Sequence, residues 1–217
     1  MQSLFSKIYF ILIVSVFISS CTDLDDTLEA PSDFYYIGSL PIPFYSNGNS
    51  DLPSINWGSE VGIFNLNDSY IGVGVNTQTG ILSWNENLPI GESIIYVTAT
   101  NSAGAAIAMV TFLHQFSGQF NGGYNSDPSA TSVTASNLNI LFNVDGTMSI
   151  TDEGNTVNGT WNLDNSKLIC LYSVASVNYE LAFDLTYSVP VNPFLEGYKK
   201  IAGSTSNSGF ARLDYIK

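Results

Sequence analysis

The side chains that most often carry catalysis are scarce in this sequence. His114 is the only histidine, and alone it completes neither a catalytic triad, which also needs a positioned nucleophile and an acid, nor a histidine metal site. We interpret it as a structural residue between two domains. Phosphate-binding glycine loops before a helix, zinc-ligand spacings and nucleophile elbows do not occur. Carboxylate pairs for glycoside hydrolysis stay an open alternative, although a small β domain rarely builds the cleft they need. We expect no enzyme and no cofactor.

Three acidic residues raise the question of a metal site. Asp145, Asp152 and Glu153 lie close together in the sequence, but a calcium loop of the EF-hand type needs more oxygen ligands at alternate positions. Asp is frequent in turns, because its side chain accepts hydrogen bonds from the backbone two residues further on. We therefore interpret all three as turn residues and expect no metal.

Aromatic side chains are the remaining candidates for binding, because their rings can stack on sugar rings. Trp57 is either exposed or packed, and both alternatives stay open. The apolar segment 190–198, with Pro190 and Pro193, is predicted to be a long loop. Such a loop forms the rim or lid of a site, or covers the core as a flap. The candidate ligand-binding residues are Trp57, Phe194 and Tyr198.

The first residues have the pattern of a secretory signal. Lys7 precedes the apolar run from Ile8 to Ile18, and this run is shorter than the roughly 20 apolar residues that a spanning helix needs. Ile18-Ser19-Ser20-Cys21 resembles the bacterial lipobox, which has an aliphatic residue, a tolerant position, a small residue and Cys. The resemblance implies cleavage after residues 1–20, a lipid on the Cys21 thiol and a membrane anchor. The alternative is a plain signal peptide with a chance cysteine.

An acidic tether follows the cysteine. Residues 21–32 include Asp23, Asp25 and Asp26. This cluster resembles the acidic export signal of lipoproteins that some Gram-negative bacteria move to the outer face of the outer membrane. The resemblance implies an outer-membrane lipoprotein that faces the extracellular side. The alternative is a solvated acidic linker, which is usual for runs of charge.

Charge narrows the range of partners. Removal of residues 1–20, which include Lys7 and no acidic residue, would leave 197 residues with five Lys and Arg against 19 Asp and Glu, a formal charge of −14. Nucleic acids and anionic lipids bind basic surfaces, so the sequence disfavours both. Neutral or cationic ligands, or simply solubility in an extracellular setting, fit the charge better.

The part of the chain after Cys21 is predicted to be all-β. Short runs rich in Val, Ile, Tyr, Phe and Thr alternate with Gly, Ser and Asn turns, and no segment has convincing helical spacing of apolar residues. The only other cysteine, Cys170, lies in an apolar strand-like run. If Cys21 carries lipid, Cys170 has no disulfide partner and is expected to be a buried free thiol.

Residues 33–115 resemble the immunoglobulin-like and cadherin-like repeats of bacterial surface proteins. Three segments carry the resemblance, in the order and at the spacing of that family: 76–84 with a Thr-Gly-Ile turn, 88–91 with a Leu-Pro-x-Gly turn, and 96–104 with a Tyr-x-Thr-x-Thr-Asn strand. The resemblance implies a β-sandwich of about seven strands and a spacer or adhesion role. The calcium-binding motifs of true cadherins are not evident, so calcium is not carried over. One predicted core-facing set is Ile95, Val97 and Ala99.

Residues 116–217 are predicted to form a second β domain. Asp145-Gly146 between alternating runs is a strong hairpin signal, and consecutive hairpins form a meander. Segment 138–147, followed by the Gly-x-Trp strand in 157–163, resembles small lipocalin-like barrels in bacterial lipoproteins. That resemblance implies a small antiparallel barrel that could hold one ligand, and a sandwich is the alternative.

The leading functional hypothesis is a cell-surface lipoprotein that serves as a non-enzymatic binding or adhesion module, accessory to glycan capture. One alternative is a structural subunit or spacer in an outer-membrane complex. The other is a lipocalin-like carrier of a small apolar ligand. An exposed aromatic strip would favour glycan binding, an enclosed cavity would favour the carrier, and an apolar flat patch would favour a protein partner.

Overall fold

The computed structural model describes residues 28–133, 138–152, 154–207 and 209–217. Strands and turns make up these residues, and none of them is helical, so the predicted all-β fold is confirmed. No helix in this part of the chain could therefore cross a membrane. The predicted signal peptide, Cys21 and the acidic cluster after it lie outside the described residues.

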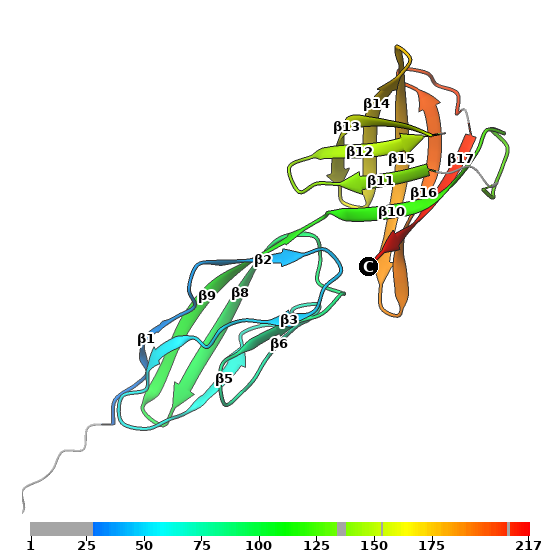
Figure 1. Ribbon diagram of the computed structural model, residues 1–217. Coiled ribbons are helices and arrows are strands. Elements are labelled where there is room, and N and C mark those ends of the chain that lie inside the picture. The colour runs from blue at the N-terminus through cyan, green and yellow to red at the C-terminus, as the bar shows by residue number, and fades with distance from the viewer. Residues whose placement is uncertain (1–27, 134–137, 153, 208) are drawn as a thin grey trace, which may run out of the picture.

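The first half of the chain is a β-sandwich (Figure 1). One sheet has the order β2-β9-β8-β5, the other has the order β3-β7-β6, and β1 pairs with β4. The strands are β1 (Ser32–Tyr35), β2 (Ser39–Pro43), β3 (Gly48–Asn49), β4 (Ser54–Asn56), β5 (Ile63–Leu66), β6 (Val73–Val75), β7 (Leu82–Trp84), β8 (Gly91–Asn101) and β9 (Gly104–Gln115). Ile95, Val97 and Ala99 are all buried in the core between the sheets, so the predicted core face of this strand is confirmed.

The second half is a closed eight-stranded barrel. Its strands pair in sequence order, each antiparallel to the next, and β10 pairs with β17 to close it. They are β10 (Gly118–Asn125), β11 (Leu138–Phe142), β12 (Thr147–Asp152), β13 (Asn155–Asp164), β14 (Lys167–Val174), β15 (Val177–Ser188), β16 (Val191–Ile201) and β17 (Gly209–Ile216). The predicted meander closes as a barrel, and its Asp145-Gly146 turn joins β11 to β12, with Gly146 at a φ of 82°.

Buried side chains fill the barrel. Phe120, Ile140, Leu181 and Leu213 point inward and are fully buried, as expected for eight strands, which enclose little more than their own side chains. Cys170 is a buried free cysteine, as predicted, and burial raises the pKa of its thiol. The thiol therefore behaves as a small apolar group.

Segment 190–198 is not the predicted long loop. Most of it belongs to β16, which forms a hairpin with β15. The two prolines misled the prediction, because proline cannot donate a hydrogen bond within a sheet. Here the pairing register shifts between Thr186 and Ser188, opposite the start of β16, and this irregularity accommodates Pro193.

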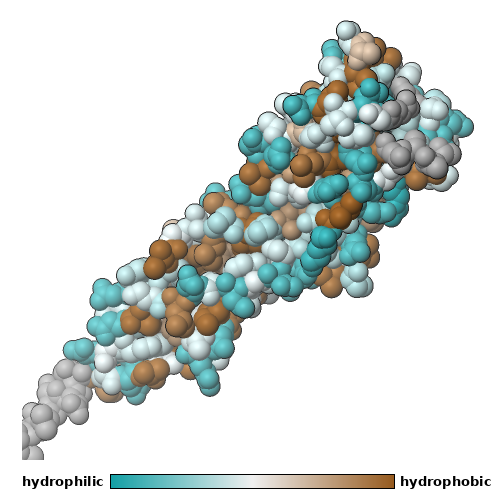
Figure 2. Space-filling view, viewed as in Figure 1, coloured by the Kyte–Doolittle hydropathy of each residue, from teal (hydrophilic) through white to brown (hydrophobic). Residues whose placement is uncertain are grey.

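A cluster of aromatic rings joins the two domains. Phe44 follows β2 in the sandwich, yet it packs into the core of the barrel. Its ring contacts Phe116 with centroids 5.0 Å apart, Tyr187 at 5.8 Å and Tyr215 at 5.3 Å. His114 of β9 stacks on the same ring at 6.0 Å. Sandwich and barrel therefore share one packed contact and lie end to end in an elongated body (Figure 2).

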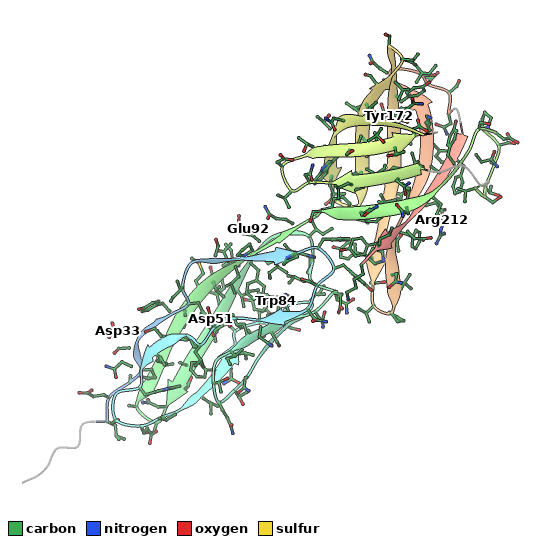
Figure 3. The ribbon with its side chains drawn as sticks, in the orientation of Figure 1. Asp33, Asp51, Trp84, Glu92, Tyr172 and Arg212 are labelled. Carbon is green, nitrogen blue, oxygen red and sulfur yellow. The ribbon has the colours of Figure 1, made fainter. Side chains whose placement is uncertain are left out.

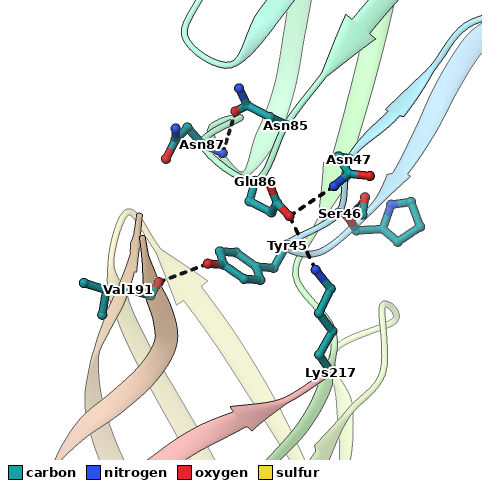
Figure 4. Close-up of polar contacts among 9 residues, drawn as sticks. Tyr45, Ser46, Asn47, Asn85, Glu86, Asn87, Val191 and Lys217 are labelled. Carbon is teal, nitrogen blue, oxygen red and sulfur yellow. Dashed lines mark hydrogen bonds and ion pairs between the residues drawn. The ribbon is translucent and has the colours of Figure 1, made fainter. Parts of the chain in front are cut away.

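Polar contacts surround this aromatic cluster (Figure 4). The Tyr45 hydroxyl donates a hydrogen bond to the carbonyl oxygen of Val191 at 3.1 Å, and Lys217 Nζ lies 3.4 Å from Glu86 Oε1. Two backbone amides also donate hydrogen bonds across the junction. The Ile90 amide donates to Tyr187 Oη at 3.1 Å, and the Val189 amide donates to Asn87 Oδ1 at 2.9 Å. The barrel hairpin β15–β16 is thereby held against the sandwich.

We expect Phe44→Ala to destabilise the barrel although the residue lies in the sandwich sequence. Loss of a buried phenylalanine costs about 3–5 kcal/mol of unfolding free energy. Urea denaturation in a Trp57→Phe/Trp84→Phe background, where the tryptophan fluorescence comes from Trp161 of the barrel alone, measures the change. Ile71→Ala, at an exposed sandwich site, is the control and should change stability little. A barrel transition that does not move in Phe44→Ala would contradict the shared core.

Candidate functional site

The outward face of β16 and β17 gathers two of the three predicted binding residues. Side chains alternate along β16, so that Leu195 is buried inside the barrel while Phe194, Glu196 and Tyr198 point outward. The antiparallel register places Asp214 opposite Phe194, Arg212 opposite Glu196 and Phe210 opposite Tyr198. We call these six residues the Arg212 face: Phe194, Glu196, Tyr198, Phe210, Arg212 and Asp214.

Arg212 organises this face. Its guanidinium carbon lies 4.2 Å from the centroid of the Phe194 ring, a cation–π distance. Its Nη1 donates to Glu196 Oε2 at 3.0 Å, and its Nη2 lies 3.8 Å from Asp214 Oδ1. The guanidinium therefore stacks over one face of the Phe194 ring and lies between two carboxylates. Arg212 lies on the outside of the barrel (Figure 3).

A second aromatic pair continues the face along the strands. The rings of Tyr198 and Phe210 meet edge to face, with centroids 5.8 Å apart. Phe210 is buried and supports Tyr198, which is 40% exposed. Tyr198 lies four residues beyond Phe194, or about 13 Å along an extended strand. The face is therefore long enough for several sugar rings.

Trp57, the third predicted binding residue, lies elsewhere. It is partly buried and packs edge to face on Phe64 of the sandwich core, with ring centroids 5.0 Å apart. Its carbonyl oxygen accepts a hydrogen bond from the Asn101 side chain at 3.0 Å. The structure does not bring Trp57 together with Phe194 and Tyr198, so we leave it out of the site.

The barrel also contains a buried ionic cluster. Lys199 and Asp152 are 6% and 5% exposed, and Lys199 Nζ lies 2.5 Å from Asp152 Oδ2. The Tyr172 hydroxyl donates to the same oxygen at 2.7 Å, and burial and this carboxylate raise the pKa of the phenol. The Lys199 ammonium also lies over the rings of Tyr124 and Tyr179, at 4.7 and 4.6 Å. Each charge has a close partner, as buried charges require.

The predicted turn role is right for Asp145 and wrong for Asp152. Asp145 accepts hydrogen bonds from the Thr147 amide at 2.9 Å and the Thr147 hydroxyl at 2.6 Å, which lower the pKa of its carboxyl group. Asp152 instead ends β12 and points inward to Lys199. Glu153 lies outside the described residues. The sequence did contain a signal for the buried pair. In a strand, Lys199 lies on the same side as Leu195 and Gly197, which is the inner side of the barrel.

No group of three or more His, Cys, Asp or Glu side chains among the described residues could hold a metal ion. The sandwich has two adjoining shallow hollows, of about 470 and 300 Å³, over β6 and β7. Both are lined by Gly74 and Ser83, with Asn49 and Asn85 at their edges. They offer amide groups and the half-buried Trp84, whereas the Arg212 face combines an exposed tyrosine with charged side chains and is the stronger candidate.

His114 is buried at the domain junction, where it was predicted to be. Its Nδ1 donates to the carbonyl oxygen of Pro89 at 3.1 Å, since a carbonyl oxygen only accepts. The residue is 2% exposed. Burial lowers the pKa of the imidazole and outweighs the hydrogen bond to Pro89, so the neutral ring is favoured. This setting suits a structural residue.

No protein-family model matches this chain. No curated protein matches it either. Among solved structures, the chain is similar to a titin structure, A168169, with 11% identity over 87% of this chain and 100% of that one and a TM-score of 0.34. It is also similar to a SusE-like surface located polysaccharide binding protein from the Bacteroides thetaiotaomicron heparin utilisation locus, with 11% identity over 83% of this chain and 44% of that one and a TM-score of 0.33. None of these likenesses bears on the function of this chain.

We expect Lys199→Met to destabilise the barrel by about 3–5 kcal/mol, because it leaves the Asp152 carboxylate buried without its cation. Asp152→Asn should restore part of the loss in the Lys199→Met background, since the neutral amide still accepts the Tyr172 hydrogen bond. Urea denaturation of the single and double variants tests this. Equal stability of wild type and Lys199→Met would contradict a buried ion pair.

The lowered pKa of His114 predicts a pH dependence of stability. Above about pH 6.5 the imidazole is neutral in both states and contributes nothing. As the pH falls below that value, the unfolded chain binds the proton first, so stability falls until the pH reaches the pKa in the folded state. We expect His114→Gln to remove this part of the loss below about pH 6.5. Identical pH profiles of wild type and variant in urea denaturation would refute it.

Proposed function

We propose that this chain is a non-enzymatic surface lipoprotein module that binds glycan through the Arg212 face. The observation that carries the proposal is the outward surface formed by the Phe194 ring and the Arg212 guanidinium, with Tyr198 exposed beside it. Flat aromatic surfaces match the apolar faces of sugar rings. The neighbouring Glu196 and Asp214 carboxylates can accept hydrogen bonds from sugar hydroxyls.

The packing of the barrel favours a site on its outside. A carrier of a small apolar ligand needs an enclosed cavity, whereas inward side chains such as Phe120, Phe142 and Phe183 are fully buried against one another. The Lys199 cluster occupies the barrel interior near the end of β12. We therefore prefer surface binding to internal carriage.

The arrangement of the domains suits capture at a cell surface. The described chain enters the sandwich next to Gly58 and Asn101, where the Asn101 side chain donates to the carbonyl oxygen of Glu29 at 2.8 Å. The barrel lies at the opposite end of the sandwich (Figure 1). If the predicted lipid on Cys21 anchors the tether, the sandwich holds the Arg212 face away from the membrane.

One observation favours the alternative of a structural subunit with a protein partner. The outer face of β8 and β9 exposes four apolar side chains, and Tyr96 and Met109 are directly opposed on it. They are Ile94, Tyr96, Ile107 and Met109, each at least 42% exposed. Adjacent exposed apolar residues of this kind are typical of interaction surfaces.

Affinity electrophoresis of the full-length chain in gels that contain polysaccharide tests the proposal. We expect at least one glycan to retard the protein. Phe194→Ala and Tyr198→Ala should each weaken binding by roughly 3- to 10-fold, the range for loss of one aromatic stacking contact. Tyr96→Ala is the matched control, because Tyr96 is 42% exposed and Tyr198 40%.

Retardation that is lost in Tyr96→Ala and kept in Tyr198→Ala would move the site to the sandwich. Absence of retardation by every glycan in a broad panel, with all variants folded by circular dichroism, would leave the protein-partner alternative.

A further inference from the structure

All Lys and Arg side chains of the described residues belong to the barrel half of the chain. Residues 33–115 contain six carboxylates and no Lys or Arg. The described chain has five Lys and Arg residues, and the carboxylates of both domains outnumber them. The five are Lys167, Lys199, Lys200, Arg212 and Lys217. An anionic ligand would therefore have to bind the barrel.

Each of these cations already has a carboxylate partner. The pairs are Lys167–Asp184 at 2.5 Å, Lys199–Asp152 at 2.5 Å, Lys200–Glu180 at 2.9 Å, Arg212–Glu196 at 3.0 Å and Lys217–Glu86 at 3.4 Å. Lys199 is buried, and Lys217 lies at the domain junction. Arg212 is the one cation among the six residues of the Arg212 face. Lys200 points outward two residues beyond Tyr198, and its ammonium is already paired with Glu180.

Arg212 cannot act as a free positive charge. Glu196 and Asp214 both contact its guanidinium, so the face carries two negative charges and one positive charge. The Arg212, Glu196 and Asp214 side chains are 42%, 44% and 70% exposed. A carboxylate or sulfate on a ligand would meet these two acceptors at the position where it needs donors.

The geometry points to an uncharged glycan as the ligand of the Arg212 face, and this inference rests on the proposed function. A sugar hydroxyl both donates and accepts. It can therefore donate to the free lone pairs of Glu196 and Asp214 and accept from an Arg212 N–H that these carboxylates leave unused. Phe194 and Tyr198 supply aromatic stacking surfaces on either side of the Arg212–Glu196 pair. Uronic acids and sulfated sugars lose affinity here, because like charges repel.

Affinity electrophoresis with two groups of polysaccharide tests the inference. The neutral group is laminarin, xylan, mannan and dextran, and the acidic group is polygalacturonate, chondroitin sulfate and heparin. We expect retardation by at least one neutral glycan and by none of the acidic ones at 0.15 M salt. The Glu196→Gln/Asp214→Asn double variant frees Arg212, and we expect it to gain retardation by acidic glycans. Arg212→Gln in that background should abolish the gain.

The outcomes separate this inference from the proposed function. Retardation of the wild type by an acidic glycan, lost in Arg212→Gln, would overturn the preference for uncharged sugars and leave glycan binding intact. A double variant that gains nothing would overturn the role of Glu196 and Asp214 in excluding anions. If no glycan of either group retards the folded wild type, the proposed function fails and the inference fails with it.

Discussion

Register between β10 and β17 is the constraint on which the rest of the structure depends. This pairing, from Gln119 opposite Ile216 to Asn125 opposite Phe210, closes the barrel. It fixes which side of every neighbouring strand faces the core, because a shift by one residue exchanges the two faces. With the observed register Leu213 is buried and Arg212 points outward. A one-residue slip would bury the guanidinium and expose the leucine. The same register therefore specifies both the barrel core and the Arg212 face.

Charge pairing is the second organising feature. A chain this acidic has few cations, and all five Lys and Arg side chains among the described residues are in ion pairs. Two of these cations have a structural role. Lys199 neutralises Asp152 inside the barrel, and Lys217 contacts Glu86 across the domain junction. Exposed pairs contribute little to stability. In the proposed glycan site, the Arg212 pairs would act on recognition, since they remove the free positive charge that an anionic ligand would need.

Local patterns in the sequence predicted the fold well, and they selected two of the six residues of the proposed Arg212 face. The alternation around Ile95 and the Asp145-Gly146 turn depend on neighbouring residues, so both were correct. Phe194 and Tyr198 were selected as members of a loop, whereas they lie on the outer face of a strand. Arg212 and the Lys199–Asp152 pair were missed, because their partners are distant in sequence and become neighbours only when the meander closes. The sequence left open whether Trp57 is exposed or packed, because no local pattern reveals its contact with Phe64.

The most direct test of the account is a titration of the ¹⁵N-labelled full-length chain with a neutral oligosaccharide, cut from the polysaccharide that retards it, followed by amide and arginine side-chain NMR shifts. The account predicts that the Arg212 Nε signal and the amides of β16 and β17 shift together and saturate, while those of β8 and β9 stay in place. Saturable shifts confined to the sandwich, or to residues inside the barrel, would contradict it.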